Sequence, residues 1–156
     1  MPFYSQSQLP QELERLGIHL SKDRGQCYLI DRNILSLIND FANLDLTQDV
    51  ILEIGPGMGQ LSDILIENSK RVYLVENDRK IVHFLASYYN KYFSTIILDP
   101  HTLNYEEIPP TIRVVIIPSD VLSIPFPRVT KIVANIPYQI SAPLMFTLIE
   151  HWNFSK

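Results

Sequence analysis

The sequence predicts an α/β fold built on a mainly parallel sheet with helices on both faces. Predominantly apolar segments at 50–54, 71–75, 113–117 and 131–135 are typical of strands that are buried on both sides. Segments with apolar residues at helical spacing lie between them. A glycine-rich turn directly follows the first strand, and ligands of such sheets bind at the carboxyl ends of the strands. We therefore expect a ligand site at that edge.

Amphipathic spacing also predicts the helices, at 10–16, 33–42, from the glycine turn to about 68, at 78–89 and at 141–150. Asp31 or Asn33 is expected to cap the second helix, and Pro143 suits the first turn of the last one. The apolar run 95–98 is short. The proline-containing stretch 99–112 predicts an insertion or a long loop.

Composition limits the class of protein. With 156 residues, of which 46% are hydrophobic and 19% charged, the chain should form one globular domain. The net charge of −4 argues against gripping nucleic acid by bulk electrostatics, although a local basic face remains open. A single cysteine, Cys27, predicts no intrachain disulfide and fits a reducing, cytoplasmic setting. We expect no signal peptide, no membrane helix and no metal, because the sequence shows no pattern for any of them.

The glycine turn points to a nucleotide-type ligand. Gly55, Gly57 and Gly59 form G-x-G-x-G between a strand and a helix, and Glu76 ends the second strand 21 residues after Gly55. A carboxylate there can accept both ribose hydroxyls, although a solvated acid at a strand end is the alternative. Nicotinamide and flavin cofactors use the same arrangement. However, a pyrophosphate prefers G-x-G-x-x-G, and the acid Glu53 suits a positively charged sulfonium better. This favours S-adenosylmethionine.

Two further strand ends carry candidate site residues. Asp120 follows the third strand and can accept from the exocyclic amine of a bound adenine, or it caps a helix. Asn135-Ile136-Pro137-Tyr138 ends the fourth strand. An aromatic amine is a poor nucleophile because its lone pair is delocalised into the ring. The Asn135 side-chain oxygen and a backbone carbonyl of Ile136 or Pro137 would hold its N–H bonds and direct the lone pair at a methyl group.

Tyr138 would then stack on an unpaired base. The alternative is structural, with Asn135 and Pro137 forming a turn and Tyr138 lying in the core. Placed beside the predicted nucleotide pocket, the segment favours methyl transfer to the amino nitrogen of a planar base.

Five segments together resemble the ribosomal RNA adenine dimethyltransferases, which modify two adjacent adenines near the 3′ end of small-subunit rRNA. The segments, which span about residues 20–150, are Gly25–Asp31, Leu52–Gly59, Val75–Asp78, Ser119–Val121 and Asn135–Pro143. The resemblance implies a Rossmann-like S-adenosylmethionine-dependent methyltransferase fold. It implies catalytic contacts with the base from Asn135, Pro137 and Tyr138, and it implies that the cofactor is bound by Gln26, Cys27, Leu29, Gly55, Gly57, Glu76, Asp120 and Asn135.

The chain departs from the family in three ways. Cys27 stands where the family usually has Asn or His, and a thiol is a weaker hydrogen-bonding group. The stretch 99–112 is long and rich in proline. The sequence also stops soon after Asn-Ile-Pro-Tyr, whereas family members continue with further strands and a C-terminal helical domain. We therefore expect an N-terminal arm at 1–24 and a partial methyltransferase domain at 25–156. We also expect an open sheet edge at the fourth strand that invites self-association or a complementing C-terminal chain, or else a fragment of a longer protein.

Two classes of function follow from this resemblance. The first is an enzyme that methylates, and dimethylates, adenine N6 in small-subunit rRNA, with the rRNA or a pre-ribosomal particle as its partner. The second is a truncated, catalytically inactive relative that binds cofactor or ribosomes, for example as an assembly factor. A large-subunit rRNA adenine methylase is a further alternative, because the same Asn-Ile-Pro-Tyr segment would serve it.

Overall fold

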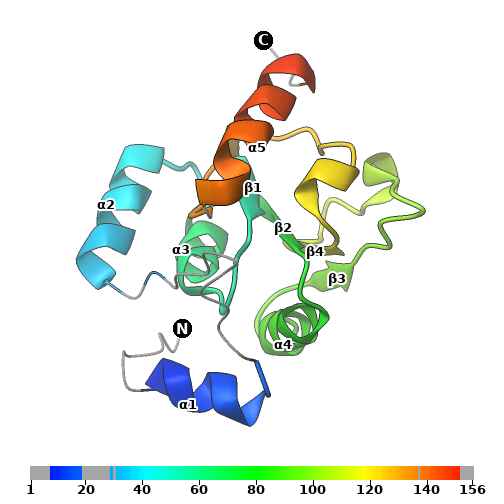
Figure 1. The fold of residues 1–156 in the computed structure, drawn as a ribbon. Helices are drawn as coiled ribbons and strands as arrows, with labels where there is room; N and C mark the ends of the chain where they lie inside the picture. Colours follow the sequence, from blue (N-terminus) through cyan, green and yellow to red (C-terminus); the bar gives the residue numbers. More distant parts are fainter. Residues whose placement is uncertain (1–7, 19–28, 30, 137, 152–156) are drawn as a thin grey trace.

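A single parallel sheet organises the molecule (Figure 1). The computed structural model describes residues 8–18, 29, 31–136 and 138–151. In this part of the chain five strands pair in the order β3-β4-β2-β1-β5, and every pair is parallel. The strands are β1 (Val50–Ile54), β2 (Arg71–Glu76), β3 (Thr95–Ile97), β4 (Val114–Pro118) and β5 (Lys131–Ile132). The predicted parallel α/β class is confirmed.

Helices connect the strands and begin where the sequence places capping residues. Asp31 accepts hydrogen bonds from the backbone of Asn33 and Ile34, and Asp78 accepts one from the backbone of Lys80 at 2.8 Å. The helices are α1 (Gln8–Arg15), α2 (Arg32–Ala42), α3 (Gln60–Asn68), α4 (Arg79–Tyr89) and α5 (Tyr138–His151), with short 3₁₀ turns η2 (Tyr105–Glu107) and η3 (Val121–Ser123).

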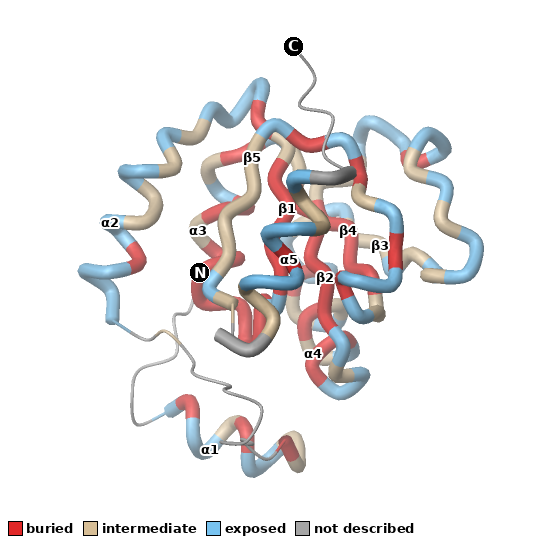
Figure 2. The backbone as a smooth tube through the Cα atoms, turned by 45° about the horizontal axis from the view of Figure 1, so that its top comes forward, coloured by how far each residue is buried: buried red, intermediate tan, exposed pale blue. Residues whose placement is uncertain are grey.

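Alternate residues of the strands face two apolar layers, which explains why the strands are apolar throughout. One layer joins Ile51, Leu74 and Ile116 of the sheet to the inward faces of α1 to α4. The other joins Leu52, Val75 and their neighbours to α5, η3 and the long loop before β4. Figure 2 shows the buried residues concentrated along the strands and the facing sides of the helices.

The stretch 99–112 forms the predicted loop, with η2 as its one regular turn, and it is tied to the sheet. The Tyr105 hydroxyl donates to the Pro125 carbonyl at 2.7 Å, and the Tyr105 ring packs edge-on against Tyr73. Arg71 donates to the carbonyls of Ile112 and Pro109. In the described part of the chain, no helix is long and apolar enough to cross a membrane.

Two element boundaries differ from the sequence prediction. The last strand was expected over 131–135, but its ladder ends at Ile132, and the backbone N–H of Val133 makes one more bond to Leu52 at 3.1 Å. Helix α5 starts at Tyr138, so Pro143 lies inside the helix instead of in its first turn. Because proline has no N–H, one intrahelical hydrogen bond is missing there.

Candidate functional site

Left-handed backbone conformations shape the glycine turn after β1. Gly55 has φ of 65°, Gly57 has φ of 55° and Gly59 has φ of 87°, a region that other residues occupy with strain. A Cβ at Gly59 would lie 2.5 Å from the Tyr89 hydroxyl oxygen, whereas a Cβ at Gly55 would meet no atom within 4 Å. These two glycines therefore serve different needs: Gly59 allows α3 and α4 to pack closely, and Gly55 leaves open space at the sheet edge.

Glu76 links the glycine turn after β1 to the turn between β2 and α4. Its carboxylate accepts from the backbone N–H of Gly57 at 3.3 Å and from that of Asp78 at 2.9 Å. The residue is 8% exposed, and burial raises the pKa of its carboxyl above the ordinary value. Each carboxylate oxygen has a second lone pair, so the group retains capacity to accept hydrogen bonds from a ligand.

Glu53 is fully enclosed, and its carboxyl has a raised pKa. Burial is the main cause that raises its pKa to about 8; the Ser62 hydroxyl partly offsets this, and the carboxylates of Asp63 and Glu76 add to it. The sequence predicted an anion that suits a positively charged ligand. The raised pKa favours the protonated form when no cation is bound. A cation placed beside it would lower its pKa and favour the ionised form.

A second buried carboxyl, that of Asp63, is joined to the glycine turn through the Tyr89 hydroxyl. The Tyr89 hydroxyl oxygen lies 3.0 Å from Asp63 Oδ1 and 3.2 Å from the Gly59 carbonyl oxygen. Burial raises the pKa of Asp63 to about 7. This pair is not among the residues predicted from the sequence; its signal is an acid at position 63 on the inward face of a helix, where a charge is costly without a partner.

Three of the predicted site residues meet at one small cavity. Leu29, Gly55 and Asn135 line a space of about 30 Å³. Its other lining residues are Glu53, Pro56, Gln60 and Leu61. That volume holds about one or two water molecules and is by itself too small for a drug-sized ligand, which occupies several hundred Å³. Residues far apart in sequence are thus brought to the carboxyl edge of β1 and β5.

Two side-chain atoms at this cavity are buried and unsatisfied among the residues that the structure describes. Glu53 Oε2 and Gln60 Nε2 have no hydrogen-bond partner there. A carboxyl oxygen accepts and an amide nitrogen donates. Buried polar atoms normally find partners, so the pair fits a ligand with both an ammonium and a carboxylate group, such as an amino acid moiety.

The remaining predicted residues are placed as follows. Gly57 and Glu76 join the site through their hydrogen bond. Asp120 is exposed at the end of β4, where it accepts from the backbone of Leu122 at 3.0 Å and so caps η3. Gln26, Cys27 and Pro137 lie outside the described residues, and of Tyr138 only the backbone is described, as the first residue of α5.

Solved methyltransferase structures share the fold of this chain. A dimethyladenosine transferase from Plasmodium falciparum superposes with a TM-score of 0.62 at 27% identity, over 81% of this chain and 39% of its own. The 23S rRNA methyltransferase ErmE superposes with a TM-score of 0.61, but its 21% identity shows the fold alone; the match covers 80% of this chain and 43% of that one. The fold is therefore of the Rossmann-like methyltransferase type.

Sequence similarity defines the family. The family described as Ribosomal RNA adenine dimethylase matches residues 18–156. The probable ribosomal RNA small subunit methyltransferase A of Methanococcoides burtonii is 37% identical over 143 residues, which cover 89% of this chain and 44% of that protein. This chain belongs to the ribosomal RNA adenine dimethylase family. It spans less than half the length of the curated relatives that it matches.

Proposed function

We propose that this chain carries the cofactor-binding part of an S-adenosylmethionine-dependent methyltransferase that methylates, and dimethylates, adenine N6 in small-subunit rRNA. The observation that carries the proposal is the meeting of Glu53, Gly55 and Asn135 at one cavity in a member of this family. The M. burtonii relative is named for the small subunit, which favours that substrate over large-subunit rRNA. The cytoplasm is the setting that we propose with it.

Each cofactor contact in the proposal uses a group that the site offers. Glu76 accepts the ribose hydroxyls from its buried position beside Gly57. Glu53 and Gln60 bind the ammonium and carboxylate of the methionine moiety with their unsatisfied atoms. Leu29 packs on the ligand, and Asp120 reaches the adenine amine with the oxygen that does not cap η3. From the family pattern, Gln26 and Cys27 complete the site. When bound, S-adenosylmethionine supplies a methyl group on a positively charged sulfur.

The catalytic part of the proposal rests on Asn135. It stands just past β5 at the edge of the cavity, exposed to an incoming base. Its side-chain oxygen accepts one N–H of the adenine amine, and a backbone carbonyl of Ile136 or Pro137 accepts the other. This holds the nitrogen lone pair toward the methyl group and needs no strong base. Tyr138 stacks on the base.

Methyl transfer tests the proposal directly. We expect the chain to transfer tritiated methyl groups from S-adenosylmethionine to unmethylated small subunits, and Asn135→Ala to lose at least about a hundredfold in rate. Asn90→Ala is the matched control, since Asn90 is exposed at the far end of α4. Full activity of Asn135→Ala would refute the catalytic role. Cofactor binding without transfer would favour the non-catalytic relative, and transfer to large-subunit rRNA alone would favour the sister methylase.

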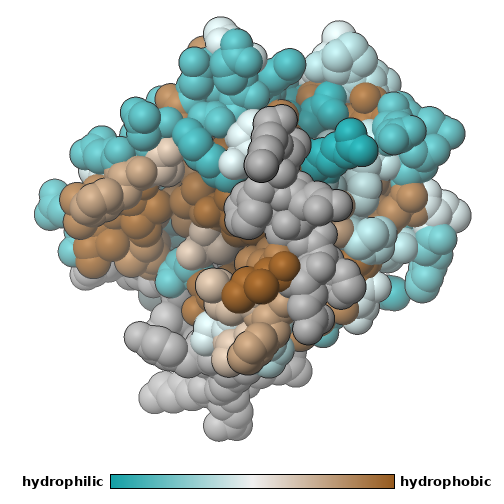
Figure 3. All heavy atoms as spheres, turned by 90° about the horizontal axis from the view of Figure 1, so that it is seen from above, coloured by the Kyte–Doolittle hydropathy of each residue, from teal (hydrophilic) through white to brown (hydrophobic). Residues whose placement is uncertain are grey.

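The partners of the sheet edge are part of the same proposal. β5 ends the strand order and pairs with β1 through two residues. Large apolar side chains are exposed on helices at this side of the chain, among them Phe41 at 81% and Ile149 at 71% (Figure 3 shows an apolar area on one face). We propose that further strands, a complementing chain or a second copy covers this edge. A monomer at micromolar concentration in light scattering would exclude the second copy.

The division into an arm at 1–24 and a methyltransferase domain from residue 25 also stays a proposal. Helix α1 packs Leu9 and Leu13 into the same apolar layer as α3 and α4, so the arm and the domain share a core. Limited proteolysis that releases the arm while α2 onward stays intact would support the boundary.

A further inference from the structure

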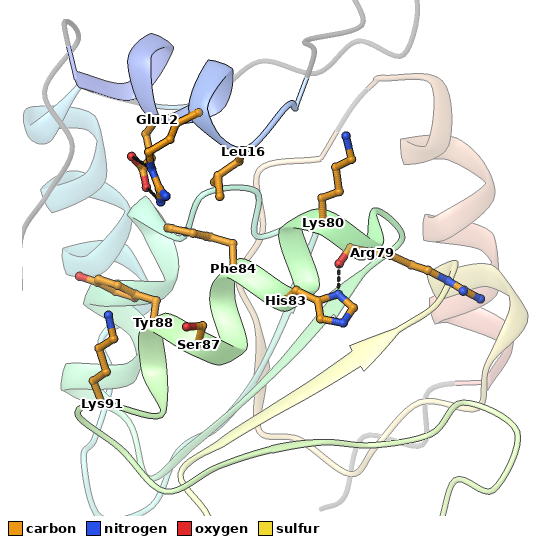
Figure 4. A pocket seen from close by; sticks show the side chains of 10 residues that line it. Glu12, Leu16, Arg79, Lys80, His83, Phe84, Ser87, Tyr88 and Lys91 are labelled. Carbon is orange, nitrogen blue, oxygen red and sulfur yellow. Dashed lines mark hydrogen bonds and ion pairs between the residues drawn. The ribbon is translucent and has the colours of Figure 1, made fainter.

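A wide groove lies between α1 and α4, apart from the cavity at Asn135. Its volume is about 730 Å³ (Figure 4). Helix α4 supplies most of the lining and α1 supplies two residues; Leu16 and Lys91 lie just past the ends of these helices. The lining residues are Glu12, Arg15, Leu16, Arg79, Lys80, His83, Phe84, Ser87, Tyr88 and Lys91.

The groove is basic although the chain is acidic. Four of its side chains are Arg or Lys and one, Glu12, is a carboxylate, in a chain whose net charge is −4. Glu12 already accepts two hydrogen bonds from Arg15, which lower the pKa of its carboxyl. Arg79, Lys80 and Lys91 are the other cations that line the groove, and a cluster of cations attracts phosphate groups.

The spacing along α4 places these residues on the half of the helix that faces away from the core. Residues 79, 83 and 87 form one row at intervals of four, and residues 80, 84 and 88 form the next. The opposite face, with Ile81, Val82, Leu85 and Tyr89, is buried in the core. From Arg79 to Tyr89 the helix rises roughly 15 Å, enough for a short run of nucleotides.

Aromatic rings lie between the cations. The rings of Phe84 and Tyr88 are nearly parallel, at 13° with centroids 5.9 Å apart, and Tyr88 also contacts Tyr92, which is 54% exposed. In Figure 4 these rings lie between Lys91 at one end and Lys80 at the other. Cations along a groove with aromatic faces between them are the pattern by which proteins bind single strands of nucleic acid.

The second wall lies outside the region that defines the family. The family match begins at residue 18, after α1 ends at Arg15. Leu9 and Leu13 anchor α1 in the core, and Lys80 Nζ donates to the Gly17 carbonyl at 2.6 Å. The α1 wall of the groove therefore lies before the matched residues, whereas the α4 wall lies within them.

We propose that the α1–α4 groove binds single-stranded RNA, with its cations on the phosphates and its aromatic faces against an unpaired base. This rests on the proposed function, which makes RNA the substrate. The groove starts three residues after Glu76, at the same sheet edge as the cavity, so it would hold RNA that flanks the target nucleotide. An acidic peptide would satisfy the cations and leave the ring faces unused, which favours RNA.

Fluorescence anisotropy with a labelled single-stranded RNA of about 12 nucleotides tests the groove, measured between about 50 and 200 mM salt. The test variant is Arg79→Ala with Lys91→Ala, since both residues are exposed. Lys80 is kept because it donates a hydrogen bond to the Gly17 carbonyl next to α1. We expect several-fold weaker binding and a salt slope that falls by about 1.4, or about 0.7 for each lost phosphate contact. The matched control is Lys70→Ala with Arg128→Ala, which removes the same charge at exposed positions elsewhere.

Phe84→Leu tests the ring face, because it keeps apolar packing; we expect weaker binding with an unchanged salt slope. If this variant fails to fold, the charge variants still decide. Equal weakening by the test and control variants, or no RNA binding by the wild-type chain, would overturn the proposal. So would displacement of RNA by a polyglutamate peptide at similar concentration, which would indicate an acidic protein partner.

Calorimetry with S-adenosylmethionine on the same variants separates this proposal from the proposed function. If the chain binds the cofactor but the groove variants bind RNA as tightly as the wild type, the groove proposal alone is refuted. RNA binding that depends on the groove, in a chain that takes up no cofactor, supports the groove and refutes the cofactor proposal.

Discussion

Replacing Glu53 with glutamine should change how the stability of the fold depends on pH. The carboxyl is fully buried, and its pKa rises from 4.5 to about 8 in the folded chain. Between these values the folded state binds more protons than the unfolded state, so the free energy of unfolding falls as pH rises through that window. The stabilisation is complete below about pH 4.5 and is lost above about pH 8.

The magnitude follows from the two pKa values. The wild-type chain should lose at most about 4 kcal/mol from this group between about pH 5 and about pH 9, at roughly 1.4 kcal/mol for each tenfold change in the ionisation constant. The amide of a glutamine at this position would stay neutral at every pH with nearly the same shape. Glu53→Gln should therefore flatten the curve and be more stable than the wild type at about pH 9.

Urea unfolding between about pH 5 and about pH 9 measures the effect, with Glu14→Gln as a control because Glu14 is exposed on α1. Buried Asp63, with a pKa of about 7, also makes the free energy of unfolding depend on pH, and the Glu53→Gln variant retains that dependence. Parallel curves for the wild type and Glu53→Gln would refute the reasoning, because they would show that Glu53 ionises as it does in water.

Two substitutions test the support beneath the glycine turn. Gly59→Ala should destabilise the chain by about 2–4 kcal/mol in urea unfolding, because its Cβ meets the Tyr89 hydroxyl at 2.5 Å and φ is 87°; Gly55→Ala, which meets no atom, should cost less, and equal losses would contradict the packing role. Tyr89→Phe should cost about 1–3 kcal/mol, because it leaves buried Asp63 without its hydroxyl partner. Unchanged stability of Tyr89→Phe would show that water replaces the hydroxyl.

The sequence predicts the sheet well because its strands are buried on both faces, and that leaves a continuous apolar signal at 50–54 and 71–75. It predicts the end of β5 poorly, since Val133 and Ala134 are as apolar as a strand but pair little beyond Ile132. Pro143 misled the prediction of where α5 starts, because a helix tolerates proline within its early turns when only one hydrogen bond is lost.

The candidate site was predictable where backbone geometry determines it. Gly55 and Glu76 follow from the spacing of a strand, a turn and a second strand, and the structure joins their turns through the hydrogen bond of Glu76 to Gly57. The raised pKa of Glu53 was not predictable, because a pKa depends on burial and neighbours that only the fold reveals. The Asp63–Tyr89 pair joins two helices, so the sequence can mark the inward-facing acid but cannot identify its partner.

Calorimetric titration with S-adenosylmethionine tests the central claim, that the carboxyl edge of β1 and β2 binds this cofactor. We expect saturable binding of one molecule per chain. Glu76→Gln should weaken it by about tenfold or more, because a hydrogen bond to a charged acceptor contributes about 1.5–3 kcal/mol. Glu14→Gln should bind like the wild type. A folded chain that gives no heat of binding, or a Glu76→Gln variant with unchanged affinity, would contradict the claim.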